Sequence, residues 1–301
     1  MKPDLSGPSV SPHFSSEARG RERRAPPIAP LTPHLFMPDA QRPLRAKMHH
    51  LTTDTRVVPH NHDWAQLALS TTGVVRLTIE NGTYIVPPSR ALWIPPGVVH
   101  AVTVLESADL MTLYVHQRLG RCGPQVPRAH EAAWRQCRVL DVSMLMRALV
   151  PELNTQPDGS GPGLSAGELQ REKRLNAMIF DELRRALPVP LGVDLPVDKR
   201  LLALCEAMLD DPTRHATLDG WAHACGASAR TVSRLFRSEL GTSFVQWRQQ
   251  VLLARAVSLA SRNMPMACIA EELGYSSASA FSAMVRRSVG APPSRFLSPN
   301  S

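Results

Sequence analysis

The stretch S-A-R-T-V-S-R-L-F-R-S-E-L-G-T-S-F at residues 228–244 decides the architecture of the C-terminal part of the chain. Its first residue is a good N-cap, which predicts a helix over Ser228–Ser238, and Gly241 is a typical C-terminal stop. Just upstream, Thr217–Ala224 predicts a shorter helix, which Gly226 interrupts. A helix, a glycine turn and a second helix are the elements of a helix-turn-helix.

The helix predicted over 228–238 has two chemically different faces. Val232 and Leu235 fall on the side that must pack against the preceding helix. The other side and the first turn supply the candidate DNA contacts, which are Ser228, Ala229, Arg230, Ser233, Arg234 and Arg237. Because a guanidinium pairs in a bidentate manner with guanine or with phosphate, this face suits the major groove of DNA.

The same pattern returns 48 residues further along the chain. Ser243 caps a predicted helix of 18 residues, which corresponds to a length of about 27 Å. After it, Ile269–Leu273 predicts a helix, Gly274 a turn and Ser276–Arg287 a second reading helix. The candidate DNA contacts of this unit are Ser276, Ser277, Ala278, Ser282 and Arg286. Two reading helices at this separation can meet major-groove segments about 34 Å apart on one face of the duplex.

The charge distribution indicates a nucleic-acid partner, and the cysteine content indicates where the protein is located. The net charge is +8, and residues 199–301 carry 12 basic and 7 acidic residues, whereas residues 48–198 carry 14 and 15. A basic C-terminal region of this kind indicates a polyanionic partner, most often nucleic acid. The five cysteines are widely spaced and contain no C-x-x-C pair, so we expect no disulfide framework and a cytoplasmic location. No apolar run is long enough to predict a membrane span.

The region before residue 199 divides into three parts. Residues 1–47 are rich in Pro, Ser and Arg without periodicity, so we expect a disordered basic arm. Residues 48–118 contain short β-rich runs separated by turn signals such as Pro95-Pro96-Gly97, which predicts an antiparallel barrel or jelly roll. Residues 119–198 are expected to form a helical linker or dimerisation region. It carries a stripe made of Leu175, Ile179, Leu183 and Leu187. That stripe either packs onto the barrel or pairs with a second copy of the chain.

Residues 199–297 resemble the DNA-binding domain of AraC/XylS-type transcriptional regulators. The resemblance rests on the stretch 228–244, on T-L-D-G-W-A at 217–222, on I-A-E-E-L-G-Y-S-S-A-S-A-F at 269–281, and on R-R-S-V-G-A-P-P-S-R-F at 286–296. It covers about a hundred residues without a gap. It implies seven helices, two recognition helices, double-stranded promoter DNA as partner and a homodimer on paired half-sites, with RNA polymerase as a further possible partner.

Three positions depart from the pattern of that family. Ala283 stands where a basic or polar residue is common, and Ala278 where Gln is common. Leu252 stands where the linking helix often has arginine. We therefore expect the first recognition helix to carry most of the direct base readout, and Arg286 with the neighbouring hydroxyls to hold phosphate.

The barrel region resembles the two sequence motifs of cupins. His60-x-His62 with Gln66, and Pro95-Pro96-Gly97-x-x-His100, match those motifs except that Gln66 replaces the usual glutamate. In cupins these residues converge on a metal, and three imidazoles could still hold a divalent ion here. The alternative is that the histidines line a ligand cavity or are hydrogen-bonded core residues. We expect an effector pocket lined by His60, His62, Trp64, Gln66, Trp93 and His100.

Two further stretches, H-N-H-D-W-A-Q-L at 60–67 and R-A-L-W-I-P-P-G-V-V-H at 90–100, are similar to a subgroup of the same family, the NimR-type regulators. The sequence thus predicts a multi-domain α+β protein, with an N-terminal cupin-like β-barrel (jelly roll) plus helices and a C-terminal all-α double helix-turn-helix domain. Its expected function is regulation of transcription from promoter DNA, with a small molecule or metal sensed in the barrel. The alternatives are a metal-dependent cupin enzyme with a helical appendage, such as an oxygenase or isomerase, and a protein-interaction adaptor.

Overall fold

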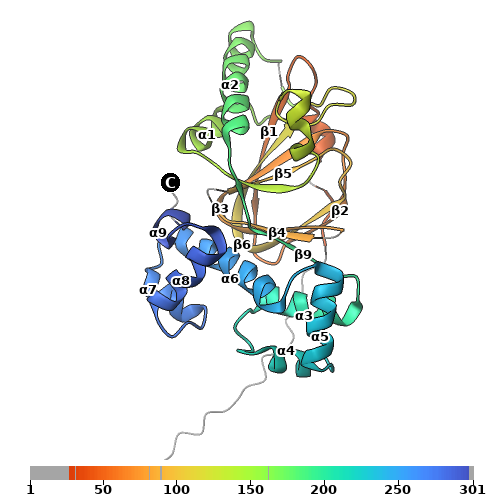
Figure 1. The fold of residues 1–301 in the computed structure, drawn as a ribbon. Helices are drawn as coiled ribbons and strands as arrows, with labels where there is room; N and C mark the ends of the chain where they lie inside the picture. Colours follow the sequence, from red (N-terminus) through yellow and green to blue (C-terminus); the bar gives the residue numbers. More distant parts are fainter. Residues whose placement is uncertain (1–26, 31, 81, 89, 162, 298–301) are drawn as a thin grey trace, which may run out of the picture.

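The computed structural model describes residues 27–297 apart from 31, 81, 89 and 162. Within those residues the chain forms an antiparallel sheet of nine strands, two helices on its upper part, and a group of helices below it (Figure 1). The predicted division into a β-rich N-terminal part and an all-α C-terminal part is confirmed.

Two long strands organise the sheet. The first six strands are β1 (Leu44–Leu51), β2 (Arg56–His60), β3 (Ala65–Ile79), β4 (Gly82–Val86), β5 (Arg90–Ile94) and β6 (His100–Val115). Strands β3 and β6 pair along most of their lengths, and the pairing shifts register between Ser70 and Val75. Gly73, with φ of +65°, lies inside this irregular stretch. Because a bulge bends and twists the strand that contains it, the outer parts of the sheet can fold over into a barrel.

Helices α1 (Met144–Leu149) and α2 (Ala166–Arg185) cover one face of the sheet. Ser165 and Glu168 form a capping box at the start of α2. Leu175, Ile179 and Leu183 are buried in one apolar cluster with residues of β1, β3, β5 and β6, whereas Leu187 is 70% exposed. The stripe therefore packs onto the sheet and is not available as a dimer surface.

The sheet extends beyond the boundaries predicted at residues 48 and 118. Strand β1 begins at Leu44, and a short 3-10 helix, η1 (Pro33–Phe36), precedes it. The predicted disordered arm is therefore wrong for its described part, because Leu44 and Ala46 are fully buried in the sheet. Residues 1–26 of that arm lie outside the described residues.

Three short strands also follow the predicted end of the barrel. They are β7 (Arg138–Asp141), β8 (Pro188–Val189) and β9 (Gly192–Asp194). Strand β7 pairs with β5, and β9 pairs with β4. The region 119–198 is therefore not wholly helical, since strands of two to four residues are too short to show periodicity.

The C-terminal unit contains seven helices in its described residues, as the family resemblance implies. They are α3 (Lys199–Asp210), α4 (Leu218–Ala224), α5 (Ala229–Leu240), α6 (Phe244–Ser261), α7 (Met266–Glu272), α8 (Ala278–Val289) and α9 (Pro293–Phe296). The connecting helix α6 has the predicted 18 residues and a capping box formed by Ser243 and Gln246. It separates one helical group, α3 to α5, from another, α7 to α9 (Figure 1).

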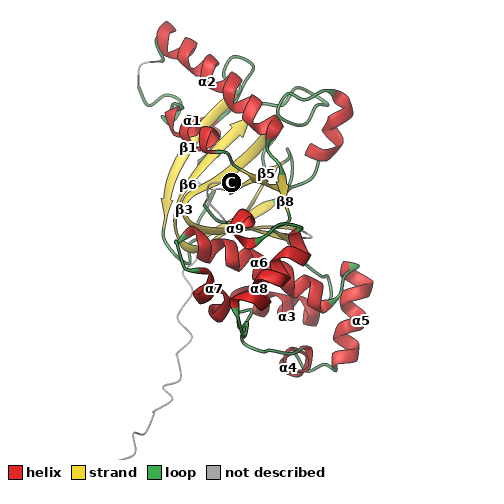
Figure 2. Ribbon diagram, turned by 60° about the vertical axis from the view of Figure 1, so that its left-hand side comes forward, coloured by secondary structure: helices red, strands yellow, loops and turns green. Residues whose placement is uncertain are grey.

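The helical unit packs directly against the sheet (Figure 2). One apolar cluster joins residues of β3, β4 and β6 to residues of α6, α7 and α8, and Leu252 is buried in it. On the other side, Val193 of β9 belongs to the core of α3 to α6, and the indole Nε1 of Trp247 donates to the carbonyl oxygen of Asp194 at 2.8 Å. The two units thus share apolar cores.

Candidate nucleic-acid interface and sensor pocket

The first helix-turn-helix is built as its sequence predicts. Thr217 caps α4 by accepting a hydrogen bond from the backbone N–H of Gly220 at 3.3 Å. Gly226, at φ of +68°, makes the turn, and the following N–H of Ala227 donates to the carbonyl oxygen of Ala222 at 3.0 Å. Ala222 is buried where the two helices cross, so its small side chain sets their close approach.

Helix α5 is fixed by one apolar face. Ser228 caps it by accepting from the N–H of Thr231, and Val232 and Phe236 are buried. The Phe236 ring meets the rings of Phe244 and Trp247 edge-on at 5.7 and 5.8 Å. The predicted inward residue Leu235 is only half-buried, because Phe236 lies one helical turn beyond Val232 and takes the central place.

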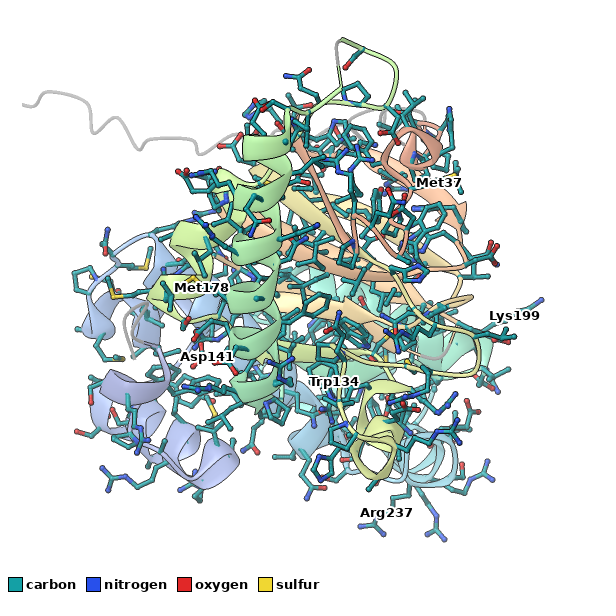
Figure 3. All side chains as sticks on the ribbon, turned by 90° about the horizontal axis from the view of Figure 1, so that it is seen from above. Met37, Trp134, Asp141, Met178, Lys199 and Arg237 are labelled. Carbon is teal, nitrogen blue, oxygen red and sulfur yellow. The ribbon has the colours of Figure 1, made fainter. Side chains whose placement is uncertain are left out.

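The opposite face of α5 is basic and exposed. Arg230, Arg234 and Arg237 follow at intervals of four and three residues, so they lie on one side of the helix. Arg237 points away from the body of the molecule (Figure 3). Among the described residues none of the three forms an ion pair with another side chain, and all three guanidinium groups are therefore available to a partner. Ser228 is exposed beside them at the helix start, while Ala229 and Ser233 are half-buried.

The second helix-turn-helix repeats the construction at α7 and α8. Gly274 has φ of +75°, and Ser277 caps α8 by accepting from the N–H of Ala280 at 3.1 Å. The predicted start at Ser276 is therefore one residue early. Phe281, Met284 and Val285 are buried and fix the helix against the core.

The exposed side of α8 is less polar than that of α5. Ser276, Ser277 and Arg286 are exposed, whereas Ala278 and Ser282 are half-buried. Ala283 is exposed at the centre of the helix with no hydrogen-bonding group. Arg287, which was not predicted as a DNA contact, is exposed beside Arg286 in the last turn, although the Arg-Arg pair is visible in the sequence.

In the barrel, the structure brings the three predicted histidines together. The ring centroids of His60 and His100 lie 4.3 Å apart, and those of His62 and His100 lie 5.3 Å apart. Each Nδ1 lies 2.8 to 2.9 Å from a backbone carbonyl oxygen, to which it donates. Burial lowers the pKa of His60, and it lowers the pKa of His100 to about 4, so both rings are neutral at pH 7.

These histidines do not fit a metal. The Nε2 of His62 lies 2.7 Å from the side-chain Oε1 of Gln66, so the Gln66 side chain stands where a metal ion bound to this nitrogen would lie. Nowhere in the described residues do three or more His, Cys, Asp or Glu side chains stand in an arrangement that could hold a metal ion. The metal centre predicted on His60, His62 and His100 therefore stays a prediction that these contacts do not support, because Gln66 replaces an anionic ligand and contacts one of the imidazoles.

The two predicted aromatic pocket residues lie in different places. Trp64 stacks on His62 with the rings nearly parallel and 5.2 Å apart, and Tyr114 meets both edge-on. Trp93 pairs with Leu67 in the register of β5 and β3, whereas Gln66 pairs with Ile94, so Trp93 faces the opposite side of the sheet. There it is fully buried, and its indole Nε1 donates to the carbonyl oxygen of Trp134. Its assignment to the effector pocket is therefore wrong.

A small cavity of about 40 Å³ lies inside the barrel beside this histidine cluster. Its polar lining comprises Lys47, His49, His60, Gln66, Thr112 and Tyr114. Lys47 was not predicted as a pocket residue because the barrel was expected to begin at residue 48, and His49 was not predicted because it belongs to neither cupin motif. The signal that could have found them is the alternation in L-R-A-K-M-H-H-L at 44–51, where every second residue faces inward.

Polar contacts connect the barrel to the helical unit. Glu106 of β6 accepts from the hydroxyl of Ser258 at 3.2 Å and forms an ion pair with Arg262, both on or just beyond α6. Arg90 of β5 is buried, pairs with Asp141 at 2.6 Å, and donates to the carbonyl oxygen of Phe296 at the end of α9.

No helix among the described residues combines enough length with enough apolar character to cross a bilayer.

Two protein-family models match this chain, and several known proteins are similar to it. Residues 48–161 match the family described as the AraC-like ligand binding domain, and residues 221–298 match a helix-turn-helix domain family. The HTH-type transcriptional regulator NimR of Escherichia coli K12 is 30% identical over 251 residues, which is 82% of this chain and 85% of that protein. The arabinose operon regulatory protein of Salmonella typhimurium LT2 is 30% identical over 71% of this chain and 76% of that protein. The structure of ToxT from Vibrio cholerae is 11% identical, covering 86% of this chain and 99% of that one, with a TM-score of 0.34.

Proposed function

Because the chain belongs to the AraC family of transcriptional regulators, we propose that it binds specific promoter sequences in double-stranded DNA through α5 and α8, under the control of a small molecule in the barrel. Its relatives are regulators of transcription, so the chain is a regulator and not an enzyme, and the cupin-enzyme alternative is set aside.

The observation that carries the proposal is the unpaired basic face of α5. Arg230, Arg234 and Arg237 are exposed on one side of a helix whose other side is fixed by buried Val232 and Phe236. A helix held in this way can enter the major groove as a rigid element, and arginine is the side chain best suited to guanine and phosphate there. Salt-dependent DNA binding through this face is expected from it, which also argues against a protein-interaction adaptor.

In this proposal the two recognition helices make different contacts with the DNA. Helix α8 presents Ala283 at its exposed centre and places Arg286 and Arg287 in its last turn. Alanine offers no hydrogen bond to a base edge, so α8 would fix the protein on the phosphates. Because Ala278 is half-buried, its methyl group can contact a thymine methyl only if α8 lies deep in the major groove. Base discrimination would then come mainly from α5.

Effector control would act through the contacts between the barrel and the helices. Because α6 shares an apolar core with β3, β4 and β6, a small change of barrel shape alters how the two helix-turn-helix units are held. Two polar contacts also connect the barrel to the helices. They are the ion pair between Glu106 and Arg262, and the hydrogen bond that Arg90 donates to the carbonyl oxygen of Phe296. A ligand that favours one barrel shape would thereby bias the population of DNA-binding arrangements.

The basic face of α5 is tested by electrophoretic mobility shift assays of the full chain. The operator fragments are first selected from genomic DNA by their binding to the full chain. The variant Arg230→Ala/Arg234→Ala/Arg237→Ala should abolish the shift. Arg234→Ala alone should weaken binding by about 1–3 kcal/mol and relax the sequence preference if that side chain reads a base.

A matched control removes the same charge from the sensor half. Arg118, Arg128 and Arg174 are exposed there, far from α5 in the sequence. The variant Arg118→Ala/Arg128→Ala/Arg174→Ala should keep the operator shift and the salt dependence of the wild type. If the α5 variant still bound operator like the wild type, the assignment of this face would be refuted.

Three further expectations belong to the same proposal. We propose a cytoplasmic homodimer that engages paired half-sites and contacts RNA polymerase at regulated promoters. Light scattering on the full chain alone and on operator DNA measures the number of protomers. A single protomer bound to a complete operator would contradict the homodimer.

A further inference from the structure

Lys47 is an unpaired cation inside the barrel. Its side chain is only 2% exposed, and its Nζ has no hydrogen-bond partner among the described residues. The Nζ lies over the face of the Phe36 ring, 5.2 Å from its centroid. Burying an ammonium group without an anionic partner or hydrogen bonds is costly, so a missing partner is expected at this place.

The neighbouring Arg45 is a buried cation that does have an anionic partner. Arg45 lies two residues earlier on the same inner face of β1 and is equally buried. Its guanidinium pairs with Asp158 at 2.7 Å and donates to the carbonyl oxygen of Gln156. Lys47 has no such neighbour, since none of the described residues that line its cavity is acidic.

The groups around the cavity are suited to an anion. Thr112 lies directly opposite Lys47 in the pairing of β1 with β6, and its hydroxyl and that of Tyr114 face the same space. The buried Nε2 of His49 also lacks a partner in the described residues. Burial and the Lys47 charge lower the pKa of His49 to about 4, so this ring is neutral and can donate one hydrogen bond. A carboxylate accepts up to about four hydrogen bonds, which these donors can supply.

The volume restricts the size of the anion. The cavity has about 40 Å³, which corresponds to roughly three water molecules. This volume favours a molecule with three or four non-hydrogen atoms over a ring or a long chain.

We propose that this cavity is the binding site of a small carboxylate, or a planar oxyanion of the same size, held by Lys47 with Thr112, Tyr114 and His49. This inference rests on the proposed function, because it assigns the chemical class of the barrel's effector. It places the anion in the barrel interior, beside the His60 and Gln66 side chains.

The test measures acetate binding to the full chain, with ionic strength held constant by gluconate, which is too large for the cavity. Acetate at a hundred times its Kd should raise the Tm by roughly 5 °C. Acetamide has the same shape without the charge and should leave the Tm unchanged. Calorimetric titration should show that Lys47→Met weakens acetate binding at least tenfold, since the ammonium is removed and the volume is kept.

The control is Lys173→Met, which removes an exposed lysine from α2 and should bind acetate like the wild type. Equal effects of acetate and acetamide on the wild type would overturn the inference without any variant. Undiminished acetate binding by Lys47→Met would overturn it as well. Operator binding by the same preparations separates the two proposals, because a wild type that shifts operator and ignores acetate refutes only the anion site.

Discussion

Replacing Lys47 by methionine should stabilise the protein at neutral pH, and the gain should disappear at alkaline pH. Burial lowers the pKa of Lys47 from 10.5 to about 8 in the folded chain. Between these two pH values the unfolded chain binds a proton that the folded chain does not, so stability rises with pH across this window. Below pH 8 Lys47 is protonated in both the folded and the unfolded chain, so the folded state carries the full cost of the buried charge. At 1.36 kcal/mol per pKa unit, this cost is about 3 kcal/mol.

The assay compares urea unfolding of the wild type and Lys47→Met at several pH values from 7 to 10.5, in gluconate and without acetate. The free energy of unfolding of the variant should exceed that of the wild type by up to about 3 kcal/mol at pH 7, and the difference should shrink as pH rises. The other titratable groups of the cavity do not confuse the comparison. The pKa of His49 is lowered to about 4 by burial and by the Lys47 charge, burial also lowers that of His60, and burial raises the pKa of Tyr114.

A control variant, Lys173→Met, should show no such difference at any pH, because that side chain is exposed. The reasoning is refuted if the difference between wild type and Lys47→Met is the same at pH 7 and pH 10.5, or if the variant is the less stable protein at pH 7. Acetate should reduce the difference at pH 7, since an anion compensates the ammonium only in the wild type.

Three other outcomes are expected. Arg286→Ala should lower operator affinity equally for all sequences and reduce the slope of log affinity against log salt by about 0.9, as measured by mobility shifts at several salt concentrations. Gly73→Ala should cost more than about 2 kcal/mol in urea unfolding, because a Cβ there would lie 2.1 Å from the carbonyl oxygen of Ser107. Ile179→Ala, at a fully buried position of α2, should lower the free energy of unfolding by about 2–5 kcal/mol, whereas exposed Leu187→Ala should change it by less than about 0.5 kcal/mol.

The elements of the helix-turn-helix units were predictable because their signals are local. A capping hydroxyl such as that of Thr217 acts on an amide three residues away, and a glycine such as Gly226 acts on its own backbone. Helical spacing likewise places Arg230 and Arg234 on one side, whatever the rest of the chain does. The basic face of α5 could therefore be predicted from residues that lie within one or two helical turns of each other.

The barrel pocket depended on contacts between residues that are distant in the sequence. Trp93 and Gln66 both suit a pocket by residue type, but the register of β3 with β5 sends them to opposite faces. A displacement by one residue reverses the face of a strand, and a strand of five residues carries too little pattern to fix it. The edge strands β8 and β9 found their places only through partners elsewhere in the sheet.

The sequence by itself thus determined the class of protein, the two helix-turn-helix units and the basic face of α5, since each is encoded within a short segment. Only the tertiary structure decided that the histidines lack the arrangement for a metal, that α2 covers the sheet, and that Lys47 stands unpaired in a cavity. The physical reason is that a buried charge is defined by what surrounds it. Its surroundings come from strands β1, β2, β3 and β6, which only folding brings together.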